Sequence, residues 1–156
     1  MGSRRRTRPI APDEAMFADV RRRAVPFDFV LDEIAELGPY TKPMFGCTAV
    51  YVEDKIVFIL RDRPTRPADN GVWIATVREH HASLRAELPS MRSIGVLGDG
   101  ETGWQILPAG VLEFEEHVLR ACELVKKRDP RIGKVPKPRR PRVARAKTPR
   151  KRARPR

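Results

Sequence analysis

Two short apolar runs separated by a charged turn form the most hydrophobic part of the chain. Residues 48–52 and 56–60 are rich in Val, Ile, Tyr and Phe, the residue types that fit a pleated, half-buried surface. The intervening residues, Glu53, Asp54 and Lys55, predict a tight hairpin connection. We therefore expect these runs to be neighbouring strands in the middle of a sheet.

Met44, Phe45 and Gly46 lie just before the first of these runs. We interpret the Met44 and Phe45 side chains as core residues. Gly46 marks a point where the backbone must turn or pack closely.

Apolar residues at helical spacing predict helices on both sides of the strands. The first begins near Pro12, has acidic residues in its first turn, and ends or kinks at Pro26. A second helix follows to Leu37, where a Gly-Pro pair ends it. Two later helices are predicted at residues 78–88 and about 109–128.

Three further strands are predicted at residues 72–77, 93–97 and 104–107, and a Gly-Asp-Gly turn joins the last two. Residues 62–71 form a polar loop with two prolines and an Asn-Gly turn. Helices that flank strands joined by short hairpins indicate the α+β class. We expect a mostly antiparallel sheet of about five to six strands flanked by helices.

Positive charge is concentrated at the two ends of the chain. Of the 32 Lys and Arg residues, 12 lie in residues 134–156, which contain no acidic residue. The other 20 are balanced by the 20 Asp and Glu residues. The pattern predicts a basic, disordered arm at residues 1–9, one globular domain at residues 10–133, and a disordered, proline-rich basic tail at residues 134–156.

The two cysteines, Cys47 and Cys122, are too few for a disulfide framework and indicate buried thiols in a reducing compartment. Acidic residues interrupt the segment where the apolar region of a signal peptide would lie. No apolar run approaches the roughly 20 residues that span a bilayer. We expect a cytoplasmic protein that does not contact a membrane.

The histidines and thiols show no pattern typical of an active site. His80 and His81 are adjacent and lack the one-turn spacing of a zinc helix, and we interpret His81 as a hydrogen-bonded core or boundary residue. His117 directly follows Glu115 and Glu116 on the solvated side of the last helix, without an evident nucleophile. Cys47 is interpreted as a structural thiol. We therefore expect a non-enzymatic protein without a cofactor or metal.

Trp73 and Trp104 allow two interpretations. Tryptophan is highly buried on average, which favours two core residues of the sheet. The alternative is a ligand-binding surface near the 62–71 loop. In that case the chain is a small-molecule-binding domain or an enzyme that uses the sheet surface near Trp73, Trp104 and His81.

The basic tail predicts sequence-independent binding to nucleic acid. Cations that neutralise phosphates release counterions, and the resulting affinity depends strongly on salt. The alternative is a tail that only increases solubility. The predicted nucleic-acid-binding residues are Lys134, Lys137, Arg139, Arg140, Arg142, Arg145, Lys147, Arg150, Lys151, Arg152, Arg154 and Arg156.

Residues 43–47, PMFGC, followed by AVYV at residues 49–52 and a second apolar strand, resemble the N-terminal domain family of TfoX/Sxy. The predicted order of elements is similar as well, and DPRIGKVP at residues 129–136 looks like the ending of some single-domain TfoX-like proteins. The resemblance covers roughly residues 26–136.

The resemblance implies a small α+β domain with a secretion-chaperone-like architecture. It also implies a role in regulating DNA uptake, or competence, together with a transcription activator, and it supplies no catalytic residues. This chain carries a basic tail where full-length members have a second, helical domain. We therefore expect a regulatory or adaptor protein that binds a protein partner and contacts nucleic acid through its tail. Another hypothesis is a module that dimerises through a sheet edge.

Overall fold

Six antiparallel strands form one open sheet in the computed structural model, which describes residues 24–98 and 102–137 of the chain. The strands are β1 (Tyr40–Met44), β2 (Cys47–Val52), β3 (Lys55–Arg61), β4 (Gly71–Ala75), β5 (Arg92–Ser93) and β6 (Trp104–Pro108). They follow the order β1-β2-β3-β4-β6-β5, and each neighbouring pair is antiparallel. The predicted α+β class, with a mostly antiparallel sheet flanked by helices, is confirmed.

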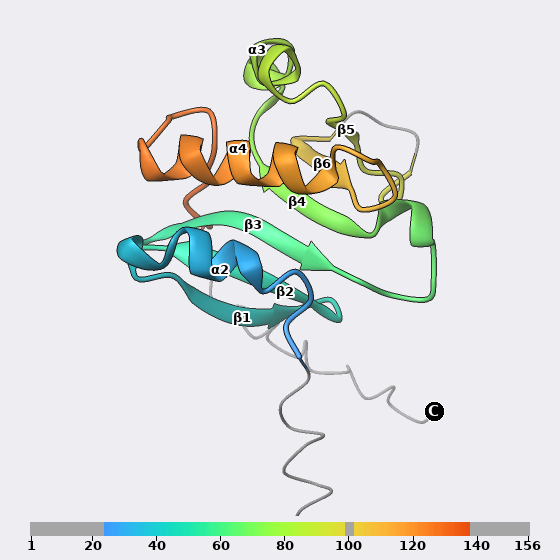
Figure 1. Ribbon diagram of the computed structural model, residues 1–156, viewed down its shortest axis with the longest axis horizontal. Helices are drawn as coiled ribbons and strands as arrows, with labels where there is room; N and C mark the ends of the chain where they lie inside the picture. Colours follow the sequence, from blue (N-terminus) through green and yellow to red (C-terminus); the bar gives the residue numbers. More distant parts are fainter. Residues whose placement is uncertain (1–23, 99–101, 138–156) are drawn as a thin grey trace, which may run out of the picture.

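Three α-helices accompany the sheet in the described residues (Figure 1). They are α2 (Phe29–Glu33), α3 (His81–Glu87) and α4 (Phe114–Lys126), with 3₁₀ turns η1 (Ala35–Leu37), η2 (Pro67–Asp69) and η3 (Arg78–His80). None of them is long and apolar enough to cross a membrane. The helix predicted to begin near Pro12 lies outside the described residues.

The main core lies between the sheet and the helices. Figure 1 shows α2 and α4 crossing the same face of the sheet. Their buried residues pack on strand residues that point to this face. The core includes Val30 of α2, Ile34 directly after it, Val118, Cys122 and Val125 of α4, and Val50, Phe58, Leu60, Val72 and Ile74 of the strands. Burial of such side chains contributes roughly 1.5–3 kcal/mol each.

Strands with a clear apolar pattern were predicted well, and strands without one were not. The β2–β3 hairpin lies where residues 48–60 predict it. β1 was not predicted because YTKPM has only exposed or half-buried side chains and no apolar alternation. β5 has only two residues, whereas a strand was predicted at residues 93–97.

Lys42 and Pro43 lie on the edge strand β1, and both residue types oppose further edge pairing.

The predicted helices are longer than the observed ones. The helix at residues 78–88 is divided into η3 and α3, and α4 begins at Phe114, after a turn at residues 109–113. α2 has only five residues and continues as η1. Gly38 then adopts φ +63°, as the predicted glycine stop requires.

The chain after α4 returns to the sheet and extends the fold to Lys134. The Gly133 amide donates to the Ala75 carbonyl at 2.8 Å. Lys134 and Ile56 exchange two backbone hydrogen bonds of 3.0 and 2.9 Å. Lys134, which the sequence assigned to the tail, is therefore held by the sheet.

Arg131 fixes this return segment to α3. Its guanidinium contacts the carboxylates of Asp129, at 2.7 Å, and of Glu87. These hydrogen bonds hold the pKa of both carboxyl groups below their usual values.

Candidate functional site

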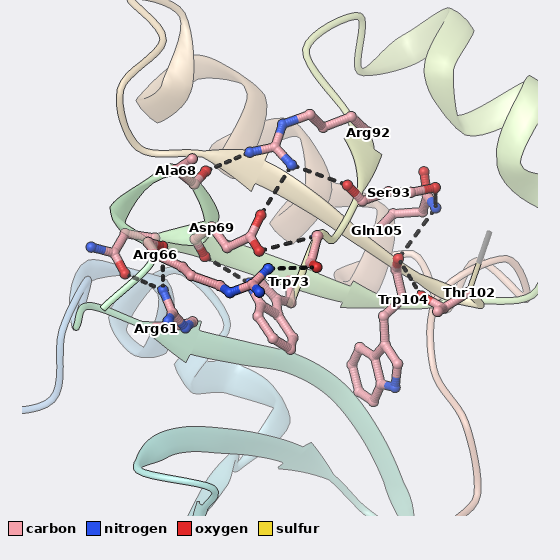
Figure 2. Close-up of polar contacts among 12 residues, drawn as sticks. Arg61, Arg66, Ala68, Asp69, Trp73, Arg92, Ser93, Thr102, Trp104 and Gln105 are labelled. Carbon is pink, nitrogen blue, oxygen red and sulfur yellow. Dashed lines mark hydrogen bonds and ion pairs between the residues drawn. The ribbon is translucent and has the colours of Figure 1, made fainter. Parts of the chain in front are cut away.

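The sheet face opposite the helices carries a second apolar cluster that contains both tryptophans. The cluster includes Ile59 of β3, Trp73 of β4 and Ile106 of β6, and Trp104 packs against it. The Trp73 and Trp104 ring centroids are 6.4 Å apart, with an interplanar angle of 55°. Figure 2 shows the two rings on the same side of the sheet, with Arg61 and Arg66 beside Trp73.

A pocket of about 460 Å³ opens on this face. Its volume lies in the range of small-molecule and cofactor sites. We call it the arginine–tryptophan pocket. Its walls are Trp73, Trp104, three guanidinium groups, and apolar residues that include Met44, Phe45, Val96 and Leu97; the cations are Arg61, Arg63 and Arg66.

Arg61 organises the loop that carries the other two arginines. It ends β3 and is buried. Its Nη1 donates to the Arg66 carbonyl at 3.0 Å and to Asn70 Oδ1 at 2.6 Å, and its Nη2 donates to the Thr65 carbonyl at 2.6 Å. A buried cation needs such partners because an unsatisfied one would be costly. The 62–70 loop therefore wraps around the Arg61 side chain.

Arg63 connects this loop to the β1–β2 hairpin. Its backbone amide donates to Asn70 Oδ1 at 2.9 Å, and Asn70 Nδ2 donates to its carbonyl at 2.8 Å. Its Nη1 donates to the Phe45 carbonyl at 2.8 Å. A Cβ on Gly46 would lie 2.1 Å from Arg63 Nη1. The glycine therefore makes room for the guanidinium.

Phe45 and Gly46 form the two-residue turn between β1 and β2, where Met44 pairs with Cys47. Both have positive φ, +50° and +74°, a conformation in hairpin turns that favours Asn-Gly. Met44 is half-buried, but Phe45 is 89% exposed. The interpretation of Phe45 as a core residue is therefore wrong, because the turn directs its side chain into solvent.

Buried Asp69 holds the opposite wall of the pocket. Its Oδ2 accepts the Gly95 amide at 3.0 Å, and its Oδ1 accepts Arg92 Nη1 at 3.1 Å (Figure 2). Its carbonyl accepts Trp73 Nε1 at 2.9 Å. Arg66 Nη1 donates to the Gly95 carbonyl at 3.1 Å. These bonds fix the Trp73 ring and the segment that brings Val96 and Leu97 to the pocket.

The pocket is electropositive as well as apolar. Within residues 24–98 and 102–137, three arginines and no carboxylate line it. A guanidinium has five N–H donors, and in this part of the chain the side chains of Arg63 and Arg66 each donate one hydrogen bond, to a backbone carbonyl. Donors therefore remain for an anionic group of a ligand. Phosphates and carboxylates match this planar fork.

The structure brings together only part of the site considered from the sequence. Trp73 and Trp104 line the pocket. His81 does not line it; it is buried at the start of α3, with Leu84 of the main core one turn away. The alternative prediction of a ligand-binding sheet surface near Trp73, Trp104 and His81 is therefore wrong in its inclusion of His81. The sequence pointed to a ligand-binding surface near the 62–71 loop as an alternative, but it did not single out the three pocket arginines. Arg61 ends a buried strand, and Arg63 and Arg66 follow it in this loop.

Lys134 lies beside the pocket. Its Nζ is 5.7 Å from the centroid of the Trp104 ring, within cation–π range, and burial lowers the pKa of its amine. Lys137 is exposed. The other ten predicted nucleic-acid-binding residues, from Arg139 to Arg156, lie outside the described residues.

His117 contacts a serine that the sequence did not place near it. Its Nδ1 is 2.6 Å from Ser90 Oγ, and its side chain is half-buried. A nucleophile and a base at this distance are one part of a catalytic arrangement. In the described part of the chain, however, no carboxylate orients the imidazole through a hydrogen bond. The contact joins the segment after α3 to α4.

The described thiols and acidic groups do not form a reactive centre. Burial raises the pKa of the Cys47 thiol more than Arg61 and Arg63 lower it, and burial raises the pKa of Cys122 to about 12. Both therefore stay protonated and unreactive near neutral pH. No group of three or more His, Cys, Asp or Glu residues in residues 24–98 and 102–137 is arranged to hold a metal ion.

No family model, curated protein or solved structure matches the chain.

Proposed function

We propose that the chain is a non-enzymatic regulatory or adaptor protein that binds nucleic acid. The observation that carries this proposal is the position of Lys134. The sheet holds its backbone, and its side chain lies against Trp104 of the arginine–tryptophan pocket. The chain therefore leaves the sheet beside an electropositive pocket, and we propose that the basic residues that follow act together with this pocket.

The tail supplies affinity that does not depend on sequence. Ten cations follow Lys137, and no acidic residue accompanies them. Each phosphate that they neutralise releases counterions. The TfoX-like resemblance supports a role in regulating transcription or competence. Because Cys47 and Cys122 are free thiols, we propose a cytoplasmic location.

A protein partner is also part of this proposal. Leu112 is 96% exposed and Leu119 is 37% exposed, and both border a groove of about 1020 Å³ beside α4. This groove lies outside the lining of the arginine–tryptophan pocket. Exposed apolar side chains around a concave surface are typical of interaction sites, so one partner can bind there while nucleic acid occupies the cationic region.

Shortening the chain to end at Lys137 tests the role of the tail. If about half of the ten removed cations contact phosphates, the slope of log K against log[salt] becomes about 4–5 units less steep. The measurement is fluorescence anisotropy of a labelled duplex, titrated with the full-length and shortened chains at several salt concentrations. Ending at Lys137 keeps the Lys134–Ile56 pairing, so the melting temperature should be unchanged and serves as the control.

An unchanged affinity and salt slope would contradict tail-mediated binding. A shortened chain that melts at a lower temperature would indicate that the tail supports the fold, and the binding comparison would then be repeated with tail arginines replaced by glutamine in the full-length chain.

A small anionic ligand is the second candidate, because the pocket combines a largely apolar lining with three arginines. A ligand that binds only the folded chain raises its melting temperature by mass action. A thermal-shift series with nucleotides and aromatic carboxylates, run on the full-length chain and on the chain ending at Lys137, separates this candidate from binding by the tail alone.

A further inference from the structure

We propose that the arginine–tryptophan pocket binds an unpaired nucleotide of a single-stranded nucleic acid. The base lies against the tryptophan rings, and the adjoining phosphate lies against Arg63 and Arg66. This inference rests on the proposed nucleic-acid-binding function and adds to it a preference for single strands.

One aromatic ring of the site, that of Trp73, is held in place before any ligand arrives. Trp73 has only 8% of its surface exposed, and its Nε1 is bonded to the Asp69 carbonyl. Trp104 is half-buried and tilted by 55° relative to Trp73. Two rings at this angle form a corner that accepts a flat group. Every base has a π-face, so such platforms bind single strands with little sequence preference.

The cationic part of the site suits a phosphodiester. Arg63 and Arg66 approach the pocket from the 62–70 loop and keep N–H donors that face no carboxylate in the pocket lining. A phosphate accepts such donors in pairs. Arg61 uses its guanidinium to hold the loop and therefore acts as a positioning residue.

Phe45 lies at the pocket rim, in a turn position that favours Asn or Gly. A non-glycine residue at φ +50° is uncommon, and Asn would fit this turn better. A phenylalanine there, with 89% of its surface exposed, gains almost nothing from the core. Outliers of this kind cluster at ligand sites. We infer that the Phe45 ring contacts the ligand as a third aromatic surface.

The geometry favours an unpaired base over a duplex. In a duplex both faces of a base are covered by its neighbours, and the base edges lie in grooves. Only an unstacked base can place a face against Trp73 or Trp104 in a concave site. Because Lys134 lies against Trp104, a strand held by the tail would reach this pocket directly.

A second aromatic–cation group lies on the same sheet face. The Tyr40 and Tyr51 rings are stacked with centroids 5.2 Å apart, and Lys42 Nζ is 5.7 and 5.2 Å from their centroids. Tyr51 belongs to the same apolar cluster as Trp73. Aromatic residues interleaved with cations on one sheet face are typical of single-strand binding surfaces.

The test uses the full-length chain and its own fluorescence, because Trp73 and Trp104 are the two tryptophans of the chain. Titration with single-stranded oligothymidylate should quench this fluorescence, and a duplex of equal length at equal salt should quench it much less. Phe45→Asn should weaken single-strand binding about tenfold, as expected for one stacking contact, and leave duplex binding unchanged. Its melting temperature should be unchanged or higher, because Asn-Gly suits the turn.

Val77→Asn is the matched control, since it removes an exposed apolar side chain outside the pocket and should change neither affinity. Arg66→Gln is the second pocket variant, and it should also weaken single-strand binding selectively. Equal quenching by free thymidine monophosphate and by the strand, at equal affinity, would overturn the proposal in favour of a nucleotide site.

The proposal would also be overturned if single strand and duplex bound with equal affinity and neither quenched the fluorescence. An unchanged single-strand affinity in both Phe45→Asn and Arg66→Gln would overturn it as well. In either case the exposed residues at the pocket rim would be assigned to a protein partner. If single strands quench the fluorescence selectively and shortening the tail has no effect, the single-strand site in the pocket is supported. Only the proposed binding of nucleic acid by the tail is then contradicted.

Discussion

Replacing Gly71 with alanine is expected to lower the free energy of unfolding by about 3 kcal/mol. Gly71 begins β4, with φ +148°, and pairs with Arg61 on one side and Pro108 on the other. A Cβ at this position would lie 2.2 Å from the Leu107 carbonyl oxygen and 2.9 Å from the Ala109 nitrogen. The strained backbone costs about 1–3 kcal/mol, and an overpacked site adds about 1–3 kcal/mol. Urea unfolding followed by tryptophan fluorescence measures the change.

Gly110→Ala is the matched control. No atom lies within 4 Å of a Cβ built at Gly110, and its φ is not in the positive region. We expect this variant to stay within about 0.5 kcal/mol of the unmodified chain. If both glycine variants unfold at the same urea concentration, β4 does not approach β6 at Gly71 as closely as described.

Replacing Arg61 with methionine is expected to have the second large effect, a loss of about 3 kcal/mol of stability together with more than tenfold weaker single-strand binding. Methionine fills much of the volume but cannot donate to the Thr65 and Arg66 carbonyls or to Asn70 Oδ1. Hydrogen bonds to charged groups contribute about 1.5–3 kcal/mol each and do not add fully. The loop then no longer holds Arg63 and Arg66 at the pocket.

Two measurements separate these effects: urea unfolding for stability, and oligothymidylate titration at a temperature where the variant is folded. Arg128→Gln is the control, because Arg128 pairs with Glu53 on the exposed surface, where ion pairs contribute about 0–1 kcal/mol. If Arg61→Met keeps full single-strand affinity, Arg61 does not position the pocket arginines.

The sequence predicts the fold best where side-chain pattern alone decides the structure. The β2–β3 hairpin follows from two apolar runs and a charged turn, and its strands are buried as their composition requires. β1 has no such pattern, because it is an edge strand held by backbone pairing to β2. The division between η3 and α3 is also absent from the pattern, since η3 has no apolar side chain that could mark where α3 begins.

The sequence pointed to the pocket through its tryptophans and the nearby 62–71 loop, but not through the loop's arginines. Their proximity depends on the pairing of β4 with β6, which no local motif encodes. Arg61 looks like a charged strand end in the sequence, but its burial follows from loop carbonyls that fold back on it. Phe45 looks like a core residue beside Met44, and only the turn geometry shows that it points outward. Such long-range arrangements explain why the cationic lining was not recognised.

Photo-cross-linking tests the account most directly. The full-length chain is mixed with a single-stranded oligonucleotide that contains 4-thiothymidine, irradiated and digested, and the cross-linked peptides are identified by mass spectrometry. We predict cross-links at Phe45 or Trp104 and within residues 138–156, with loss of the Phe45 cross-link in Phe45→Asn. Cross-links confined to the surface around Leu112, or to the tail with none at the pocket, would contradict the proposed single-strand site.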